Sequence, residues 1–181
     1  MPIAFLDRDG AIVVDKHYLD DPSGLEFLPG AVDGLKTLSA MGYALAVVTN
    51  QSGVGRGYFS RQTAEAINTR LVRLLAERGV VIEAVAMCPH APEEGCDCRK
   101  PAPGMAHRAA RRIGQGFGGA VVIGDKESDI GLAKAIGARS ILIGEAGADP
   151  HGADGVAEDM VEAAAIIAML DDAPAGKGTD K

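Results

Sequence analysis

The sequence predicts an α/β fold: a doubly wound, Rossmann-like and mostly parallel sheet with helices on both faces. Short apolar runs rich in β-branched residues recur along the chain, and segments with helical spacing lie between them. Such alternation implies right-handed crossovers, which set parallel strands side by side. A polar cluster follows four of the five runs, and in such folds ligands bind beyond the carboxyl ends of the strands.

The first half of the chain contains two predicted strands and two predicted helices. Ile3 to Leu6 and Ala44 to Val48 are continuous apolar runs, which are typical of strands buried on both faces. Ala31 to Met41 has helical spacing of its apolar residues. Ser60 to Arg78 has the same spacing and begins with a serine that can cap the helix.

The second half repeats the alternation with three more strands and three more helices. In chain order these are the strand Val85 to Met87, the helix Pro103 to Ile113, the strand Val121 to Ile123, the helix Ser128 to Ile136, the strand Ser140 to Ile143 and the helix Asp159 to Leu170. Ser128 is the second predicted N-cap. The predicted helix stops are Gly42, Gly79, Gly114 and Gly137.

Length and composition indicate one domain. The chain has 181 residues, of which 47% are hydrophobic, enough for one sizeable core. We expect a single domain over residues 1–170, without a separate cap domain, because no insertion along this stretch is long enough to form one. Residues 171–181 are rich in Ala, Gly and charge and are expected to form a disordered tail.

Charge and hydropathy exclude several kinds of partner. The net charge is −7 and the 18 basic residues are scattered, so we expect no nucleic-acid partner. No apolar run approaches the roughly 18 residues of a membrane span, and no secretion signal opens the chain. We therefore expect a cytoplasmic monomer that acts on a small molecule, with no membrane partner.

The polar clusters suit phosphoryl transfer. Asp7, Asp9 and Asp125 follow two predicted strands, with the Thr49 hydroxyl and either Lys100 or Lys126 nearby. Carboxylate oxygens suit Mg²⁺, which takes phosphate oxygens as further ligands. One aspartate can attack phosphorus, and a second can protonate the leaving oxygen and later deprotonate water.

Each cluster also has a structural interpretation. Asp-Arg-Asp-Gly at residues 7–10 can be an Asx-type turn, Thr49-Asn50-Gln51 an ordinary loop, and Gly124-Asp125-Lys126 a turn with a solvated lysine. Their shared position at one edge of the sheet favours the chemical interpretation over the structural one.

Four residues in one loop suit a structural zinc ion. Cys88, His90, Cys96 and Cys98 follow the pattern C-x-H-x5-C-x-C and include every cysteine of the chain. Zn²⁺ takes three thiolates and one imidazole in a closed tetrahedral site, which is structural rather than catalytic. The alternatives are a chance group of buried or reactive cysteines and Cys-His nucleophilic catalysis.

Four segments together resemble the haloacid dehalogenase superfamily of aspartate-nucleophile phosphatases. They are "FLDRDG", "TNQSGVGRGYF", "CPHAPEEGCDCRKPAPGM" and "GDKESD". Within the superfamily they look most like the D-glycero-D-manno-heptose-1,7-bisphosphate 7-phosphatases, with the histidinol-phosphate phosphatases second. The resemblance spans roughly Ile3 to Leu170 and departs at Ala11, where the family usually has Thr or Val.

The resemblance implies roles for individual residues. Asp7 matches the nucleophile, Asp9 the general acid/base, and Thr49 and Lys100 the residues that stabilise the phosphoryl group. Asp7, Asp125 and the Asp9 backbone carbonyl match the Mg²⁺ ligands, and the cysteine loop matches a zinc site. The residues that match substrate contacts are Asp15, Lys16, His17, Tyr18, Asn50, Gln51, Ser52, Arg99 and Lys126.

Arginines favour a substrate with two phosphates. Arg56 and Arg99 each carry a guanidinium fork that can grip a phosphate, and an uncapped site accepts a large polar molecule. The expected function is removal of the 7-phosphate of heptose 1,7-bisphosphate through an aspartyl phosphate, in the synthesis of ADP- or GDP-heptose precursors of lipopolysaccharide or surface glycan. The alternatives are a histidinol-phosphate phosphatase, a phosphotransferase or mutase, and a non-catalytic sugar-phosphate-binding protein.

Overall fold

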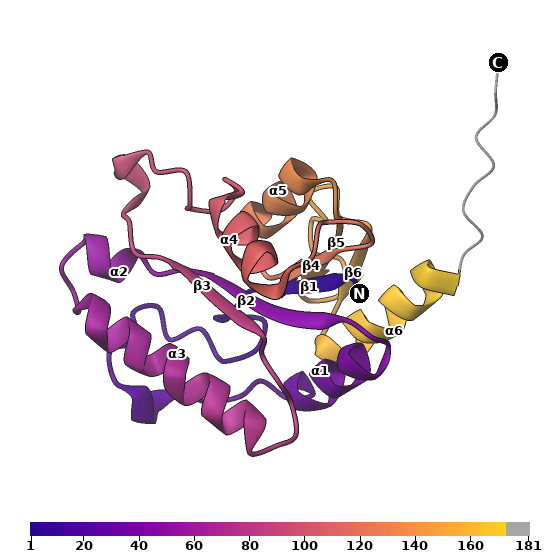
Figure 1. Ribbon diagram of the computed structural model, residues 1–181, viewed down its shortest axis with the longest axis horizontal. Helices are drawn as coiled ribbons and strands as arrows, with labels where there is room; N and C mark the ends of the chain where they lie inside the picture. Colours follow the sequence, from indigo (N-terminus) through magenta and orange to yellow (C-terminus); the bar gives the residue numbers. More distant parts are fainter. Residues whose placement is uncertain (173–181) are drawn as a thin grey trace.

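A computed structural model describes residues 1–172, which form a six-stranded sheet with helices on both faces (Figure 1). In sheet order the strands are β3 (Ala84–Cys88), β2 (Ala44–Asn50), β1 (Ile3–Leu6), β4 (Val121–Gly124), β5 (Arg139–Ile143) and β6 (Gly155–Ala157). All neighbouring strands run parallel. The chain proceeds outward from β1 to β3 and then returns to the other side of β1 with β4. A ligand crevice is expected at this reversal, beyond the carboxyl ends of β1 and β4.

Two hydrophobic cores, one on each face of the sheet, hold the helices in place. All four residues of β1 are buried, and their side chains alternate: Ala4 and Leu6 enter one core, Ile3 and Phe5 the other. The first core contains residues of α1 (Ala31–Ala40), α3 (Arg61–Ala76) and α6 (Met160–Asp172), and the second contains residues of α4 (Gly104–Ile113) and α5 (Glu127–Ile136). The predicted doubly wound α/β fold is confirmed.

In each of the first three connections a short element lies between the strand and the longer helix that follows. These elements are the 3-10 helix η1 (Pro22–Gly24) after β1, the short helix α2 (Ser52–Gly55) after β2 and the 3-10 helix η2 (Pro92–Glu94) after β3. Within residues 1–172 none of these insertions forms a cap domain, as predicted. No helix in this part of the chain combines the length and the apolar character needed to traverse a bilayer.

Of the two predicted N-cap residues, Ser60 is confirmed and Ser128 is wrong. The Ser60 side chain accepts a hydrogen bond from the Thr63 N–H (3.0 Å), so the N-cap of α3 is confirmed. The prediction that Ser128 caps α5 is wrong, because the helix begins at Glu127 and its N-cap is Lys126. The reason is Asp129, whose carboxylate accepts the Lys126 N–H (3.1 Å) and so places Ser128 inside the first turn.

Two differences concern the C-terminal part. Strand β6 was not predicted, because three residues that include a glycine carry too little pattern. Helix α6 continues to Asp172, beyond the predicted end at Leu170, and the Asp171 carboxylate pairs with Arg139 and accepts a hydrogen bond from the Tyr43 hydroxyl (3.0 Å). The expected tail therefore does not begin at Asp171. Residues 173–181 lie outside the described part, and the division into one domain and a tail stays a prediction.

Candidate active site

A cavity of about 470 Å³ opens at the carboxyl edge of the sheet, above β1, β2 and β4. Asp7 directly follows β1, Asn50 ends β2, and Lys126 follows the end of β4 by two residues. The residues that line the cavity are Asp7, Asp9, Asp15, His17, Tyr18, Asn50, Ser52, Arg99, Lys100, Lys126 and Ser128. All but Ser128 are among the predicted site residues, so one cavity gathers residues from four separate segments.

Lys100 is buried between two aspartates at the floor of the cavity. Its Nζ lies 2.9 Å from Asp7 Oδ1 and 2.6 Å from Asp129 Oδ1, and all three side chains are buried. Burial disfavours the lysine charge, but the carboxylates of Asp7 and Asp129 outweigh this and raise the pKa of Lys100. The lysine therefore stays protonated and can hold negative charge at this position.

Three carboxylates crowd together beside this lysine. Oxygen atoms of Asp7, Asp125 and Asp129 all lie within 4.8 Å of one another. Burial, followed by repulsion from Asp7, raises the pKa of Asp125 to about 7 and that of Asp129 to about 6. In addition, Asp125 Oδ1 is buried with no hydrogen-bond partner among the described residues. This concentration of oxygen ligands and uncompensated charge fits a divalent cation such as Mg²⁺.

Two glycines allow the carboxylates to approach the backbone closely. Gly10 has φ of +84°, and a Cβ there would lie 2.2 Å from Asp125 Oδ2. A Cβ at Gly124 would lie 2.2 Å from the Asp129 carboxyl carbon. Any larger residue would displace a site carboxylate, so the glycines of "DRDG" and "GDKESD" are part of the site's construction.

Asp129 is a site residue that sequence reasoning missed. It is the last letter of "GDKESD", four residues after Asp125 and in the first turn of α5. An acidic residue in the first turn of a helix is common, because its negative charge interacts favourably with the helix dipole. The signal that could have found it is the one-turn spacing from Asp125, which brings both carboxylates to the same side of the helix start.

Asp9 is held by two donors. The Arg8 guanidinium lies 2.9 Å from Asp9 Oδ2 through Nη2, and Gln51 Nε2 donates to the same oxygen at 2.8 Å. Gln51 Nε2 also donates to the buried Thr49 hydroxyl at 2.8 Å. Gln51 thus links Asp9 to Thr49, although neither Gln51 nor Thr49 lines the cavity. Arg8 is a second site residue that sequence reasoning missed.

Asn50 fixes the backbone of Lys100. Its side-chain oxygen accepts the Lys100 N–H at 3.1 Å, and its side-chain nitrogen donates to the Lys100 carbonyl at 3.3 Å. Asn50 was predicted to contact substrate. The structure gives it a further task, which is to tie the loop after β3 to the end of β2.

Charged side chains lie at the rim of the cavity. Lys126 Nζ lies 3.1 Å from Asp15 Oδ2 and 3.7 Å from Asp125 Oδ2, and these carboxylates, against the effect of burial, raise the pKa of Lys126. His17 is exposed at the rim. The Tyr18 ring meets Tyr58 edge to face, with centroids 4.7 Å apart.

Two predicted substrate contacts lie away from the cavity lining. Lys16 Nζ donates to the Gly24 carbonyl (2.9 Å) and pairs with Glu26 (3.2 Å). Arg56 is exposed and is the C-cap residue that follows α2. The structure does not bring either side chain to the aspartates.

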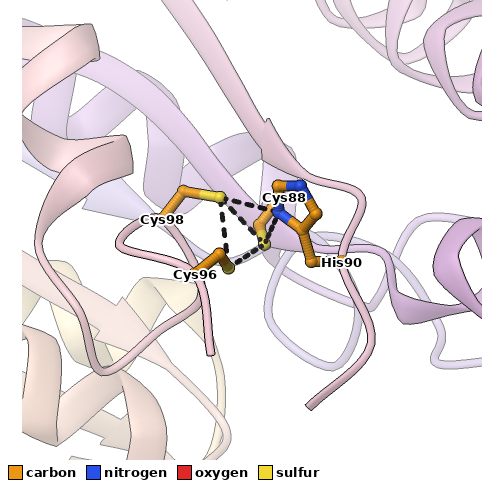
Figure 2. Close-up of side chains that lie close together, drawn as sticks. All are labelled: Cys88, His90, Cys96 and Cys98. Carbon is orange, nitrogen blue, oxygen red and sulfur yellow. Dashed lines mark hydrogen bonds between the residues drawn. The ribbon is translucent and has the colours of Figure 1, made fainter. Parts of the chain in front are cut away.

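The four predicted zinc ligands point toward one another (Figure 2). The sulfur of Cys98 lies 3.2 Å from that of Cys88 and 3.5 Å from that of Cys96, and His90 Nδ1 lies 3.2 Å from Cys98. A tetrahedron with Zn–S bonds of about 2.3 Å has edges of about 3.8 Å, close to these spacings and far from a disulfide bond of about 2 Å. The donor set and its geometry therefore fit Zn²⁺.

Comparison with known proteins gives consistent matches. A protein-family model described as HAD-hydrolase-like matches residues 97–173. A relative from Pseudomonas putida named D-glycero-beta-D-manno-heptose-1,7-bisphosphate 7-phosphatase is 42% identical over 144 residues, or 79% of this chain and 82% of the relative. A relative of the same name from Pseudomonas aeruginosa is 37% identical, over 78% of this chain and 80% of that one.

Solved structures with the same fold include one with ligands bound. The crystal structure of D,D-heptose 1,7-bisphosphate phosphatase from Bordetella bronchiseptica, complexed with magnesium and phosphate, has a TM-score of 0.81 and 34% identity. The match covers 96% of this chain and all of that one. A HAD-like phosphatase from Mesorhizobium loti has a TM-score of 0.79 and 32% identity, over 98% of this chain and 90% of that one.

Proposed function

The chain belongs to the haloacid dehalogenase superfamily and is a phosphoric monoester hydrolase, and we propose that it removes the 7-phosphate of D-glycero-D-manno-heptose 1,7-bisphosphate. The observation that carries the proposal is the buried group of Asp7, Lys100, Asp125 and Asp129 at the floor of an open polar cavity. The names of the relatives from Pseudomonas support the substrate.

Asp7 is the proposed nucleophile. Its Oδ1 accepts the Arg8 N–H at 2.8 Å and lies 2.9 Å from Lys100 Nζ, while Oδ2 has no hydrogen-bond donor among the described residues. Oδ2 is therefore the oxygen available to attack phosphorus. The new Oδ2–P bond forms as the bond between phosphorus and the sugar oxygen breaks, which yields an aspartyl phosphate.

Asp9 is the proposed general acid and base. It donates a proton to the departing sugar oxygen, and then takes a proton from the water that attacks the aspartyl phosphate. Lys100 and Thr49 are the groups that hold the negative charge of the phosphoryl oxygens.

Asp7 and Asp125 are the side chains that would hold Mg²⁺, with the Asp9 backbone carbonyl as a further ligand. When bound, Mg²⁺ neutralises charge on the phosphoryl oxygens during transfer. The unpartnered Asp125 Oδ1 and the raised pKa values of the two neighbouring carboxylates support a cation at this position.

The second phosphate has candidate partners at the rim. Arg99 and Lys126 both line the cavity, and Ser52 and His17 add polar groups. A guanidinium fork can take two phosphate oxygens. We assign the distal phosphate to Arg99 and Lys126, while a role for Arg56 stays a prediction. The cysteine loop is proposed to bind structural Zn²⁺.

The family also supports a biological setting. A phosphatase of heptose bisphosphate supplies the precursors of ADP- or GDP-heptose for lipopolysaccharide or surface glycan. We infer a cytoplasmic enzyme that works as a monomer on its small sugar-phosphate substrate.

The experiment that tests the proposal measures phosphate release from heptose 1,7-bisphosphate and from histidinol phosphate, each with Mg²⁺ and with excess chelator. We expect Mg²⁺-dependent release from the bisphosphate, a product that retains its 1-phosphate, and at least about a hundredfold loss of rate in Asp7→Asn. Preference for histidinol phosphate would contradict the substrate, and undiminished turnover by Asp7→Asn would contradict the mechanism.

A further inference from the structure

Arg8 is a fully buried cation placed between the two aspartates of "DRDG". A buried guanidinium is costly unless its donors are matched by acceptors, and apolar residues of similar volume often stabilise a core as well. A residue of this kind at this place therefore calls for a specific reason. Its side-chain partners among residues 1–172 are two: Asp9 and Asn68.

The guanidinium is anchored at both ends. Its Nε lies 3.2 Å from Asp9 Oδ1 and 3.1 Å from Oδ2, and its Nη2 lies 2.9 Å from Oδ2. Its Nη1 donates to Asn68 Oδ1 at 2.9 Å, a contact between the loop after β1 and helix α3. Because a guanidinium is planar and rigid, two anchors fix the direction in which it presents its donors to Asp9.

The contacts distinguish the two oxygens of Asp9. Oδ2 accepts from Arg8 and, at 2.8 Å, from Gln51, so its lone pairs are engaged from both sides. Oδ1 has only the long contact of 3.2 Å with Arg8 Nε. Oδ1 is therefore the oxygen left to meet the substrate, and the Arg8 fork keeps it turned that way.

Asn68 lies outside the reach of substrate. It lines a separate cavity of about 540 Å³ between α3, β3 and α4, which shares no lining residue with the active-site cavity. Its Nδ2 also lies 3.7 Å from the Met87 sulfur on β3, but its contact toward the active site is the one with Arg8.

We propose that Arg8 and Asn68 are positioning residues that hold the Asp9 carboxylate in the orientation for proton transfer to the leaving oxygen. The inference rests on the proposed function, since it concerns the acid step of the same reaction. It predicts an effect on one chemical step, which a purely structural role for the pair would not produce.

The leaving group provides the readout. A sugar alkoxide needs a proton as it departs, whereas p-nitrophenolate is stable without one, so loss of general acid catalysis slows the sugar ester more. The ratio kcat/KM reports the steps up to formation of the aspartyl phosphate and so isolates the departure of the leaving group. Loss of fold or of active enzyme would lower kcat/KM for both esters equally.

The test compares Asn68→Ala with wild type on heptose bisphosphate and on p-nitrophenyl phosphate. We expect about a tenfold fall in kcat/KM for the sugar ester and less than about threefold for the aryl ester. Asn68→Asp keeps an acceptor for Arg8 and should recover most of the loss. Thr69→Ala, an exposed neighbour on α3 that lines the same separate cavity, is the control and should match wild type.

A double mutant gives an independent check on the sugar ester alone. If Asn68 acts through Asp9, adding Asn68→Ala to Asp9→Asn should lower kcat/KM no further than Asp9→Asn alone. Equal loss on both esters, or additive losses in the double mutant, would overturn the inference. If Asp9→Asn itself showed no preference between the two esters, the acid role of Asp9 in the proposed function would fail instead.

Discussion

At the scale of single residues, the site is a concentration of buried negative charge. Asp7 and Asp129 share one buried lysine, while Asp125 has an oxygen with no protein donor among the described residues. The protein tolerates this arrangement at the cost of raised pKa values for Asp125 and Asp129. A cation that binds there would therefore stabilise the fold as well as the reaction.

The pH dependence of the metal effect follows from these pKa values. Asp125 and Asp129 keep their protons in the folded state up to about pH 7 and pH 6, but lose them near pH 4 in the unfolded chain. Without metal, these groups therefore reduce the stability of the fold as pH rises through that interval. Mg²⁺ favours the ionised carboxylates, so we expect it to raise Tm by roughly 3 °C at pH 8 and very little at pH 5, as measured by thermal denaturation.

Asp125→Asn is the matched variant for this prediction. It removes the charge but keeps the size, so the metal-free variant should have a higher Tm than metal-free wild type at pH 8 and should show no Mg²⁺ shift. An equal Mg²⁺ shift at both pH values, or one that persists in the variant, would contradict the assignment of the metal site.

The sequence predicts which residues belong to the site better than it predicts which side chains they contact. Asp7, Asp9, Lys100 and the zinc ligands lie in short motifs, which the sequence displays directly. The contact of Arg8 with Asn68 joins two segments that carry no shared pattern, so only the packing of α3 on the sheet reveals it. For the same reason Asn50 could be predicted in the site, but its two bonds to the Lys100 backbone could not.

At the scale of elements, the cysteine loop connects the end of β3 to the active site. Cys98 is followed directly by Arg99 and Lys100, and Arg99 Nη1 donates to the His90 carbonyl within the same loop at 3.5 Å. From Cys88 to Cys98 the buried apolar residues are Cys88, Ala91 and Cys98, two of which are predicted zinc ligands, so a metal ion is expected to supply the order of the loop. The position of Lys100 then depends on the metal as well as on Asn50.

Loss of zinc should therefore affect activity more than the sheet. In Cys96→Ser we expect kcat/KM to fall by at least about tenfold, while Tm falls by only a few degrees. Metal analysis should show one zinc per wild-type chain and less than one in the variant. Glu93→Ala, an exposed change in the same loop, is the control. Parallel loss of activity and of the folded sheet would contradict this division of labour.

The start of α5 shows where element prediction stops. Ser128 has a favoured residue type for an N-cap. However, the Asp129 carboxylate accepts the Lys126 N–H, and the helix begins at Glu127, one residue before Ser128. The same carboxylate pairs with Lys100. A tertiary contact of Asp129 thus helps to set the first residue of α5, and helix propensity alone does not contain that information.

At the scale of the whole molecule, alternation of strands and helices was enough to predict the doubly wound fold and the edge that carries the site. The order of the strands was not predicted, since alternation alone does not say which side of β1 each later strand joins. The outermost strand, β6, depends on contacts with β5 and α6 rather than on a pattern of its own.

Asp171 of α6 contacts two residues at the amino-terminal ends of strands, Arg139 of β5 and Tyr43 before β2. Asp171 pairs with Arg139 and accepts a hydrogen bond from the Tyr43 hydroxyl, whose pKa is raised to about 12 by burial and by that carboxylate. We expect Asp171→Ala to lower the free energy of unfolding by about 1 kcal/mol, because the pair is partly exposed to solvent. Urea denaturation measures this, and kcat should not change.

Asp172→Ala is the control, since Asp172 forms no ion pair within residues 1–172. A change in kcat with Asp171→Ala would show that α6 communicates with the active site, contrary to the expectation.

The central place of β1 has a consequence for synthesis on the ribosome. Asp7 and Asp9 leave the exit tunnel before β4, which is the second neighbour of their strand. They also leave it before Lys100, Asp125 and Asp129, which bring the countercharge and the remaining carboxylates. The nascent chain therefore carries the proposed nucleophile, Asp7, before it carries an active site. A ribosome that stalls before residue 129 releases a fragment that lacks the phosphatase site, however much of the sheet has already formed.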